Sequence, residues 1–159
     1  MTLKLYGEEM KIRLFILLIT VIALSGCTTV TTSEEESWID NGQDMAEVLV
    51  FRGNERTNSI VEAGIGSQSN YVVALNVLEY TVLSIPVGDH TLRVGGGSAT
   101  SFDIEVSLSQ SETTCIQVKG NATQAVAVLV PILVAAIPGF IAEIVSCPSA
   151  EQLRQFKKV

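Results

Sequence analysis

The chain has few of the side chains from which most catalytic and metal sites are built. It contains one histidine and three cysteines among 159 residues. Most metal sites and catalytic triads need several such groups together, so the sequence predicts neither a metal centre nor a cofactor. Basic residues are also scarce, because 10 lysines and arginines stand against 17 acidic residues, for a formal net charge of -7. A nucleic-acid-binding surface needs an excess of positive charge, so this balance argues against nucleic acid as a partner.

Charge of either sign is sparse as well. Charged residues make up 17% of the chain and apolar residues 47%. This composition excludes a disordered protein and exceeds the apolar content of an ordinary soluble domain, so part of it is expected to lie outside a core. The length predicts one domain plus a targeting segment.

The N-terminus has the layout of a bacterial export signal. Lys11 and Arg13 precede an uncharged apolar run of about a dozen residues, too short for a comfortable membrane span, which needs about 20. The run ends in Leu24, Ser25, Gly26 and Cys27. This ending resembles the lipobox of bacterial lipoproteins, in which signal peptidase recognises the first three residues and the cysteine is acylated, for example with palmitate. Residues 1–26 are therefore expected to be a signal peptide, with Met10 as an alternative start.

The resemblance also implies an address for the mature protein. A diacylated or triacylated Cys27 would bind membrane lipid stably. Thr28 follows it, where an aspartate favours inner-membrane retention in enterobacterial lipoproteins. We therefore expect a cell-envelope lipoprotein at the outer membrane, facing the periplasm. Residues 27–45 are mostly polar and are expected to form the tether between this cysteine and a domain over residues 46–159.

Short strands bounded by turn residues dominate the predicted domain. The expected strands are 46–52, 71–75, 80–85, 90–94, 101–108 and 113–119, with a loop at 53–66 because of its glycines. The clearest alternates apolar Phe102, Ile104, Val106 and Leu108 with polar residues. This period of two places one face in a core, and the whole pattern predicts a mainly β fold, a small antiparallel β-sandwich.

Two local motifs refine this prediction. Pro86, Gly88 and His90 mark a turn that is expected to join two strands as a hairpin, with His90 in a structural role. Ser149, followed three residues later by Gln152, predicts the start of a short C-terminal helix, with Lys157 and Lys158 near its end. Leu153 and Phe156 are expected to pack this helix on the sheet.

The strand at 46–52 and the Pro-x-Gly-x-His-x-Leu pattern at 86–92 resemble a family of bacterial lipoproteins of unknown function. Its members have a small sandwich akin to PEGA and carboxypeptidase-regulatory domains. The resemblance implies a fold and an address, and no activity.

A hydrophobic insertion is expected at about 122–142, within which Ala125 to Ala142 carries no charge. Two interpretations stay open. As a helix, these 18 residues could just cross a bilayer, giving a two-span inner-membrane protein with a periplasmic β domain. Alternatively, the insertion packs on the domain, dips into lipid or contacts another protein. Cys115 and Cys147 flank it, and a disulfide between them favours the second interpretation, with two free thiols as the alternative.

No candidate catalytic residue emerges from the pattern. His90 shares strand parity with apolar Leu92 and Val94, and Asp103 and Glu105 alternate with core residues. We therefore expect a non-enzymatic scaffold or binding module with an unknown partner. An envelope enzyme is the least favoured alternative.

Overall fold

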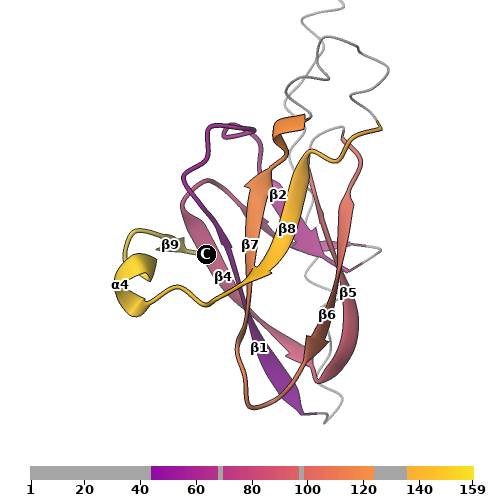
Figure 1. Cartoon of the computed structure of the whole chain (residues 1–159), viewed down its shortest axis with the longest axis vertical. Coiled ribbons are helices and arrows are strands. Elements are labelled where there is room, and N and C mark those ends of the chain that lie inside the picture. Colours follow the sequence, from indigo (N-terminus) through magenta and orange to yellow (C-terminus); the bar gives the residue numbers. More distant parts are fainter. Residues whose placement is uncertain (1–43, 68–69, 97–98, 124–135) are drawn as a thin grey trace, which may run out of the picture.

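The computed structural model describes residues 44–67, 70–96, 99–123 and 136–159. These form two β-sheets that face each other across a common core (Figure 1). The strand order is β8-β7-β1-β4-β9 in the larger sheet and β3-β2-β5-β6 in the smaller one. The predicted mainly β sandwich is confirmed.

The elements have the following bounds. The larger sheet comprises β1 (Met45–Arg52), β4 (Glu79–Pro86), β7 (Thr114–Gly120), β8 (Phe140–Val145) and β9 (Lys157–Lys158). The smaller comprises β2 (Ala63–Gly66), β3 (Tyr71–Leu75), β5 (Gly88–Gly95) and β6 (Phe102–Leu108), and the helix is α4 (Ala150–Leu153). The pairs β1–β7 and β4–β9 are parallel, whereas the other strand pairs are antiparallel. The larger sheet is thus mixed, because β7 follows a strand of the opposite sheet and enters from the same end as β1.

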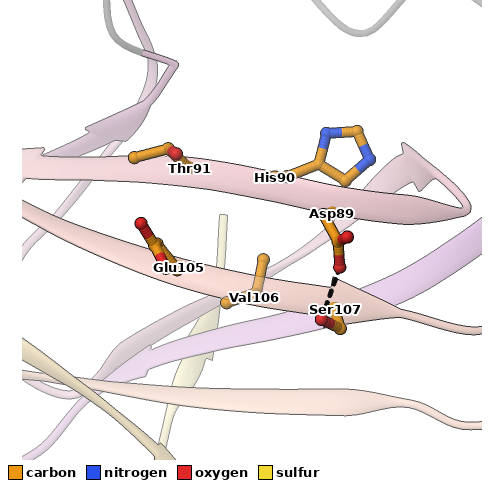
Figure 2. A pocket seen from close by; sticks show the side chains of 6 residues that line it. All are labelled: Asp89, His90, Thr91, Glu105, Val106 and Ser107. Atoms are coloured by element: carbon orange, nitrogen blue, oxygen red, sulfur yellow. Dashed lines mark hydrogen bonds between the residues drawn. The ribbon is translucent and has the colours of Figure 1, made fainter.

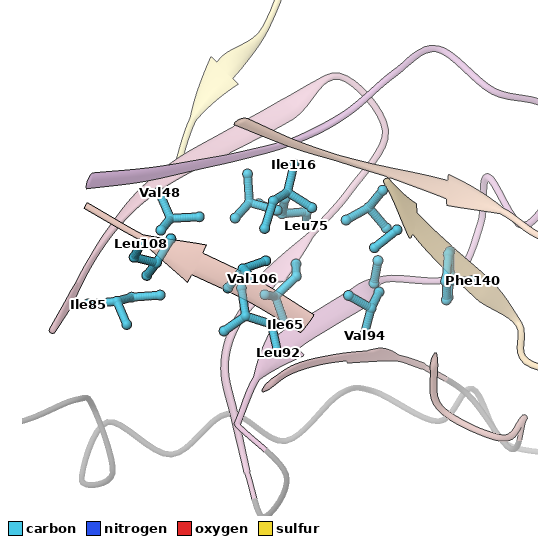
Figure 3. Close-up of a cluster of buried hydrophobic side chains, with 14 of the residues drawn as sticks. Val48, Ile65, Leu75, Ile85, Leu92, Val94, Val106, Leu108, Ile116 and Phe140 are labelled. Atoms are coloured by element: carbon cyan, nitrogen blue, oxygen red, sulfur yellow. The ribbon is translucent and has the colours of Figure 1, made fainter. Parts of the chain in front are cut away.

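The core lies between the two inner faces, and its buried members are aliphatic side chains and Phe140 (Figure 3). In β1, Val48 and Val50 are completely buried, and in β5 the inward residues are Leu92 and Val94. Each such side chain stabilises the fold by about 1.5–3 kcal/mol through burial. In β6 the predicted alternation is confirmed, because its charged residues are exposed while Val106 and Leu108 are buried.

The strands β2 and β8 lie where the sequence predicted other structures. The expected loop at 53–66 ends in β2, which pairs with both β3 and β5 and is buried throughout. Side chains of β2 alternate as in any strand, but glycine occupies every second position: Ala63 and Ile65 enter the core and alternate with Gly64 and Gly66. The expected insertion at 122–142 overlaps β8, in which Phe140 and Ala142 are core residues. The insertion therefore ends before Phe140.

The Pro86 turn is a corner between the sheets, and the predicted hairpin is wrong. β4 pairs with β1 and β9, whereas β5 pairs with β2 and β6. Val87 alone separates β4 from β5, and Gly88 has a φ of 131°, in the range that favours glycine. The chain thus changes sheet over very few residues.

The C-terminal helix begins as predicted. Ser149 is its N-cap, and the reciprocal bonds of a capping box with Gln152 are present. The helix ends at Leu153, however, and Lys157 and Lys158 form the short strand β9 beside β4. The prediction that these lysines lie at the end of the helix is wrong, since pairing with the β4 backbone takes them into a sheet.

Candidate functional site

The predicted lipidation site, Cys27 with Leu24, Ser25 and Gly26, lies outside the described residues. The structure nevertheless shows where the tether enters the domain. The amide of Val87 donates to the carbonyl oxygen of Asp44 at 2.9 Å. The tether therefore joins the sandwich beside the corner. We call this the corner end, defined by residues 44, 86–89 and 109–113.

Cys115 and Cys147 form a disulfide, with 5.1 Å between their Cα atoms. Cys115 lies on the outer face of β7 and is 1% exposed, whereas Cys147 is exposed just after β8. The bond fastens residues 146–159, the C-terminal arm, to the outer face of the larger sheet. Of the two alternatives that the sequence left open, bonded or free thiols, the structure has the bonded one.

The C-terminal arm also packs on that outer face through apolar side chains. Leu153 and Phe156 contact a small cluster around Leu49, Phe51 and Cys115, as predicted for the two arm residues. The rings of Phe51 and Phe156 meet edge to face with centroids 5.7 Å apart. Beside this contact lies a groove of about 470 Å³ whose polar lining includes three glutamine side chains: Gln117, Gln152 and Gln155.

A second fastening of the arm involves Glu79. Its carboxylate accepts a hydrogen bond from the Asn76 amide at 2.9 Å and pairs with Lys157 at 3.2 Å. Burial raises the pKa of Glu79, but the bonds from Asn76 and Lys157 outweigh that effect, and the net pKa lies below its ordinary value. Thr81 donates to the carbonyl oxygen of Val159 at 3.1 Å, which holds the end of the arm against β4.

The opposite end of the sandwich gathers the connections that leave β1 and β7 (Figure 1, where the purple loop and the orange turn lie at the upper end). We call it the loop end, defined by residues 53–62, 99–101, 121–123 and 136–139. The amide of Asn121 donates to Gly139 O, and its side chain donates to Pro138 O, each at 2.9 Å. Residues 124–135, most of the predicted insertion, lie outside the described residues. Asn121, before this segment, and Gly139, after it, therefore lie next to each other.

A buried arginine organises the loop end. Arg52 is completely buried, and its guanidinium donates to Asn58 O and Val61 O at 2.6 Å each and to Leu75 O at 3.2 Å. Its charge also lies 4.9 Å from the centre of the Phe140 ring. Burial lowers the pKa of Arg52, an effect that the charge of Glu55 partly offsets. The sequence pattern does not single out Arg52, since an arginine that closes a strand is usually exposed.

A third feature is a polar hollow on the outer face of β5 and β6, lined by Asp89, His90, Thr91, Glu105, Val106 and Ser107 (Figure 2). Ser107 donates to Asp89, and Figure 2 shows the imidazole of His90 turned away from both. His90 Nε2 instead donates to Pro86 O at 2.7 Å, across the corner. This geometry fits the structural role expected of Pro86, Gly88 and His90, because the imidazole ties β5 to the end of β4.

Next to the hollow, β5 and β6 carry an ion pair. Arg93 donates to both carboxylate oxygens of Asp103, at 2.8 and 2.9 Å. Hydrogen bonding from Arg93 lowers the pKa of Asp103. Within the described parts of the chain, no three histidine, cysteine or carboxylate side chains gather into a group that could hold a metal ion.

Comparison of the chain with family models, with curated proteins and with solved structures finds no match. The residues themselves therefore carry the functional argument. In the described ranges, none of the helices combines the length and apolar character required for a membrane span.

Proposed function

We propose that the protein is a membrane-anchored envelope lipoprotein whose β-sandwich serves as a non-enzymatic scaffold or binding module. Its partner in the membrane is lipid, reached through acylated Cys27. The observation that carries the proposal is the use of the three cysteines. Cys115 and Cys147 are bonded to each other, which leaves Cys27, at the end of the lipobox-like sequence, as the remaining thiol.

The disulfide also supports export. Disulfides form and persist in oxidising compartments such as the bacterial periplasm and are rare in the cytosol. Export is the step that the signal-like sequence at 1–26 predicts. Thr28 after the cysteine favours the outer membrane within this proposal. The proposed family is the one that the sequence resembles, lipoproteins with a PEGA-like or carboxypeptidase-regulatory-like sandwich.

The geometry of the loop end argues against the two-span alternative. A single crossing by residues 125–142 would place its two ends about 30 Å apart, on opposite sides of the hydrocarbon layer. Asn121 and Gly139 are instead hydrogen-bonded at 2.9 Å, and β7 and β8 are paired. The 16 residues from 122 to 137 are also too few to cross and return, since that would take about 40 in helices. We propose that this segment contacts lipid or protein without crossing the membrane.

Metabolic labelling with an alkyne analogue of palmitate tests the anchor. We expect label on the native protein and its loss in Cys27→Ala. Cys147→Ser is the matched control, because it removes a cysteine but leaves the lipobox-like sequence, and it should keep the label. Label that persists in Cys27→Ala would overturn the anchor.

Two further measurements test compartment and topology. Alkylation without reductant should find no free thiol on Cys115 or Cys147 in protein taken from the native host, and two alkylated sites would contradict export to an oxidising compartment. A protease added to spheroplasts should remove a flexible epitope tag appended after Val159. Protection of the tag would instead favour the two-span protein.

A further inference from the structure

The most exposed large apolar side chain of the described residues is Ile60, which is 96% exposed at the loop end. A single exposed isoleucine is common on protein surfaces and needs no function of its own. The surroundings of Ile60 are less ordinary. The neighbouring backbone is held by the buried guanidinium of Arg52, and one residue of this loop, Asn58, has a positive φ.

The guanidinium of Arg52 binds the carbonyl oxygens on both sides of Ile60, those of Asn58 and Val61. Asn58 has a φ of 55°, in the left-handed region, and its side chain donates to Gly139 O at 2.6 Å. Burying a cation costs free energy, and asparagine is among the residues that tolerate a positive φ best. In this protein, Arg52 and Asn58 fix the conformation of a loop whose most exposed large side chain is apolar, and this favours a role of the loop in contacting a partner.

The charges of the sandwich are distributed unequally between its two ends. Four carboxylates lie at the corner end or in the strand residues next to it: Asp44, Glu47, Asp89 and Glu112. Among the described residues there, no lysine or arginine is present. At the loop end, the two carboxylates Glu55 and Glu62 are balanced by exposed Arg56, four residues before Ile60, and by the buried Arg52. An anionic lipid surface would therefore repel the corner end more strongly than the loop end.

We propose that the loop 53–62 is a membrane-contacting tip, in which Ile60 enters the boundary between headgroups and acyl chains and Arg56 stays at the headgroups. This inference rests on the proposed function, because the lipid anchor is what holds the domain beside a bilayer. A lipid surface is the occupant favoured by the charge distribution. Gly139, which follows the uncharged sequence 124–135 in the chain, accepts a hydrogen bond from Asn58 of this loop, so an uncharged sequence adjoins the proposed tip in the chain.

The tether allows this orientation although it enters at the corner end. Residues 28–44 are 17 residues and span at most about 60 Å when extended. The eight residues of β1 extend about 27 Å along the sandwich. The tether can therefore pass the full length of the domain and leave the loop end against the bilayer.

A pair of tryptophan reporters tests the tip in the full lipidated chain. Trp38→Phe removes the native tryptophan, and Ile60→Trp then reports on the loop end. Val87→Trp is the matched control, since Val87 is 43% exposed and lies at the corner end. Each protein is reconstituted in phosphatidylethanolamine and phosphatidylglycerol vesicles with brominated acyl chains. We expect several-fold stronger quenching, and a blue-shifted emission, for Ile60→Trp than for Val87→Trp.

Equal quenching of the two reporters, or stronger quenching of Val87→Trp, would overturn the tip. Ser59→Trp, at an exposed neighbouring position, provides a second reporter if Ile60→Trp unfolds, and the same comparison applies. Flotation of the vesicles separates the two proposals. Protein that floats with an unquenched tip refutes the tip and keeps the anchor. Protein that does not float refutes the anchor, and quenching of Ile60→Trp at high vesicle concentration then supports or refutes the tip by itself.

Discussion

At the scale of single residues, Arg52 joins the loop after β1 to the core. Replacing it with methionine keeps much of the side-chain volume but removes the guanidinium that donates to the carbonyl oxygens of Asn58, Val61 and Leu75, where the bond to Leu75 is buried and the other two are partly buried. We expect Arg52→Met to lower the free energy of unfolding by about 2–4 kcal/mol. Urea denaturation of the mature chain in detergent measures the loss.

Arg93→Met is the matched control for this prediction. Arg93 also makes two charge-assisted bonds, but its side chain and that of Asp103 are 32% and 39% exposed. Partly exposed ion pairs stabilise proteins by about 1 kcal/mol or less. Equal losses in the two variants would show that burial does not set the contribution of Arg52.

Gly88 makes the corner between the sheets possible through its backbone alone. Its φ is 131°, and a Cβ added there would meet no atom within 4 Å. Gly88→Ala is therefore expected to cost about 1–3 kcal/mol from strain without a clash. Gly53→Ala is the control, because a Cβ there would make only ordinary contacts, the nearest at 3.4 Å. A thermal melt in which Gly53→Ala is the more damaging variant would contradict this account of the corner.

At the scale of elements, the attachment of β9 to β4 depends on pH through Glu79. The pKa of Glu79 is lower in the folded protein than its ordinary value of 4.5, so the charged form is favoured by folding. Its contribution is therefore complete above the unfolded pKa and is lost as the pH falls through the lower folded value. We expect the amides of Lys157 and Val159, which donate to Leu78 O and Tyr80 O, to lose protection from hydrogen exchange below about pH 4.5.

Glu79→Gln should weaken this protection at neutral pH and remove much of its acid dependence. Glu143→Gln provides the control, since Glu143 also pairs with a lysine, Lys119, but on the exposed surface of β7 and β8. An unchanged acid profile in Glu79→Gln would show that another group governs the arm.

Elements whose information is local could be predicted from the sequence. The alternation in β6 and the Ser149 capping box follow from spacing alone, and both are present in the structure. Elements that depend on distant partners could not. β2 has two glycines in four residues and is a strand because β3 and β5 bind both of its edges. β9 has only two residues, and its pairing with β4 decides its conformation.

The candidate sites divide in the same way. The cysteine pair could be predicted because it depends on residue type and context, whereas the lipobox-like sequence lies outside the described residues and stays a prediction. Arg52 and Ile60 could not be predicted, because their roles depend on burial. One is the charged end of an apolar strand and is buried, while the other is apolar and exposed. A local pattern predicts the reverse for both.

At the scale of the whole molecule, the hydrogen bond between Asn121 and Gly139 implies that the fold and the apolar segment can be separated. Replacing residues 122–137 with a four-residue glycine and serine loop should leave the sandwich intact, since loops of 2–5 residues commonly close hairpins. Shortening the connection from 16 residues to 4 reduces the entropy cost of loop closure by about 1 kcal/mol. We therefore expect equal or slightly higher stability in urea denaturation.

The matched change is a four-residue replacement of 53–62, the other long connection at the loop end. That variant removes two of the three carbonyl partners of Arg52 and leaves its charge buried, so it should lose several kcal/mol. Stability lost in the 122–137 variant and kept in the 53–62 variant would reverse the roles given to the two connections. With the expected result, the 122–137 sequence is not needed for folding, and selection for membrane or partner contact becomes the simplest reason for so long an uncharged segment.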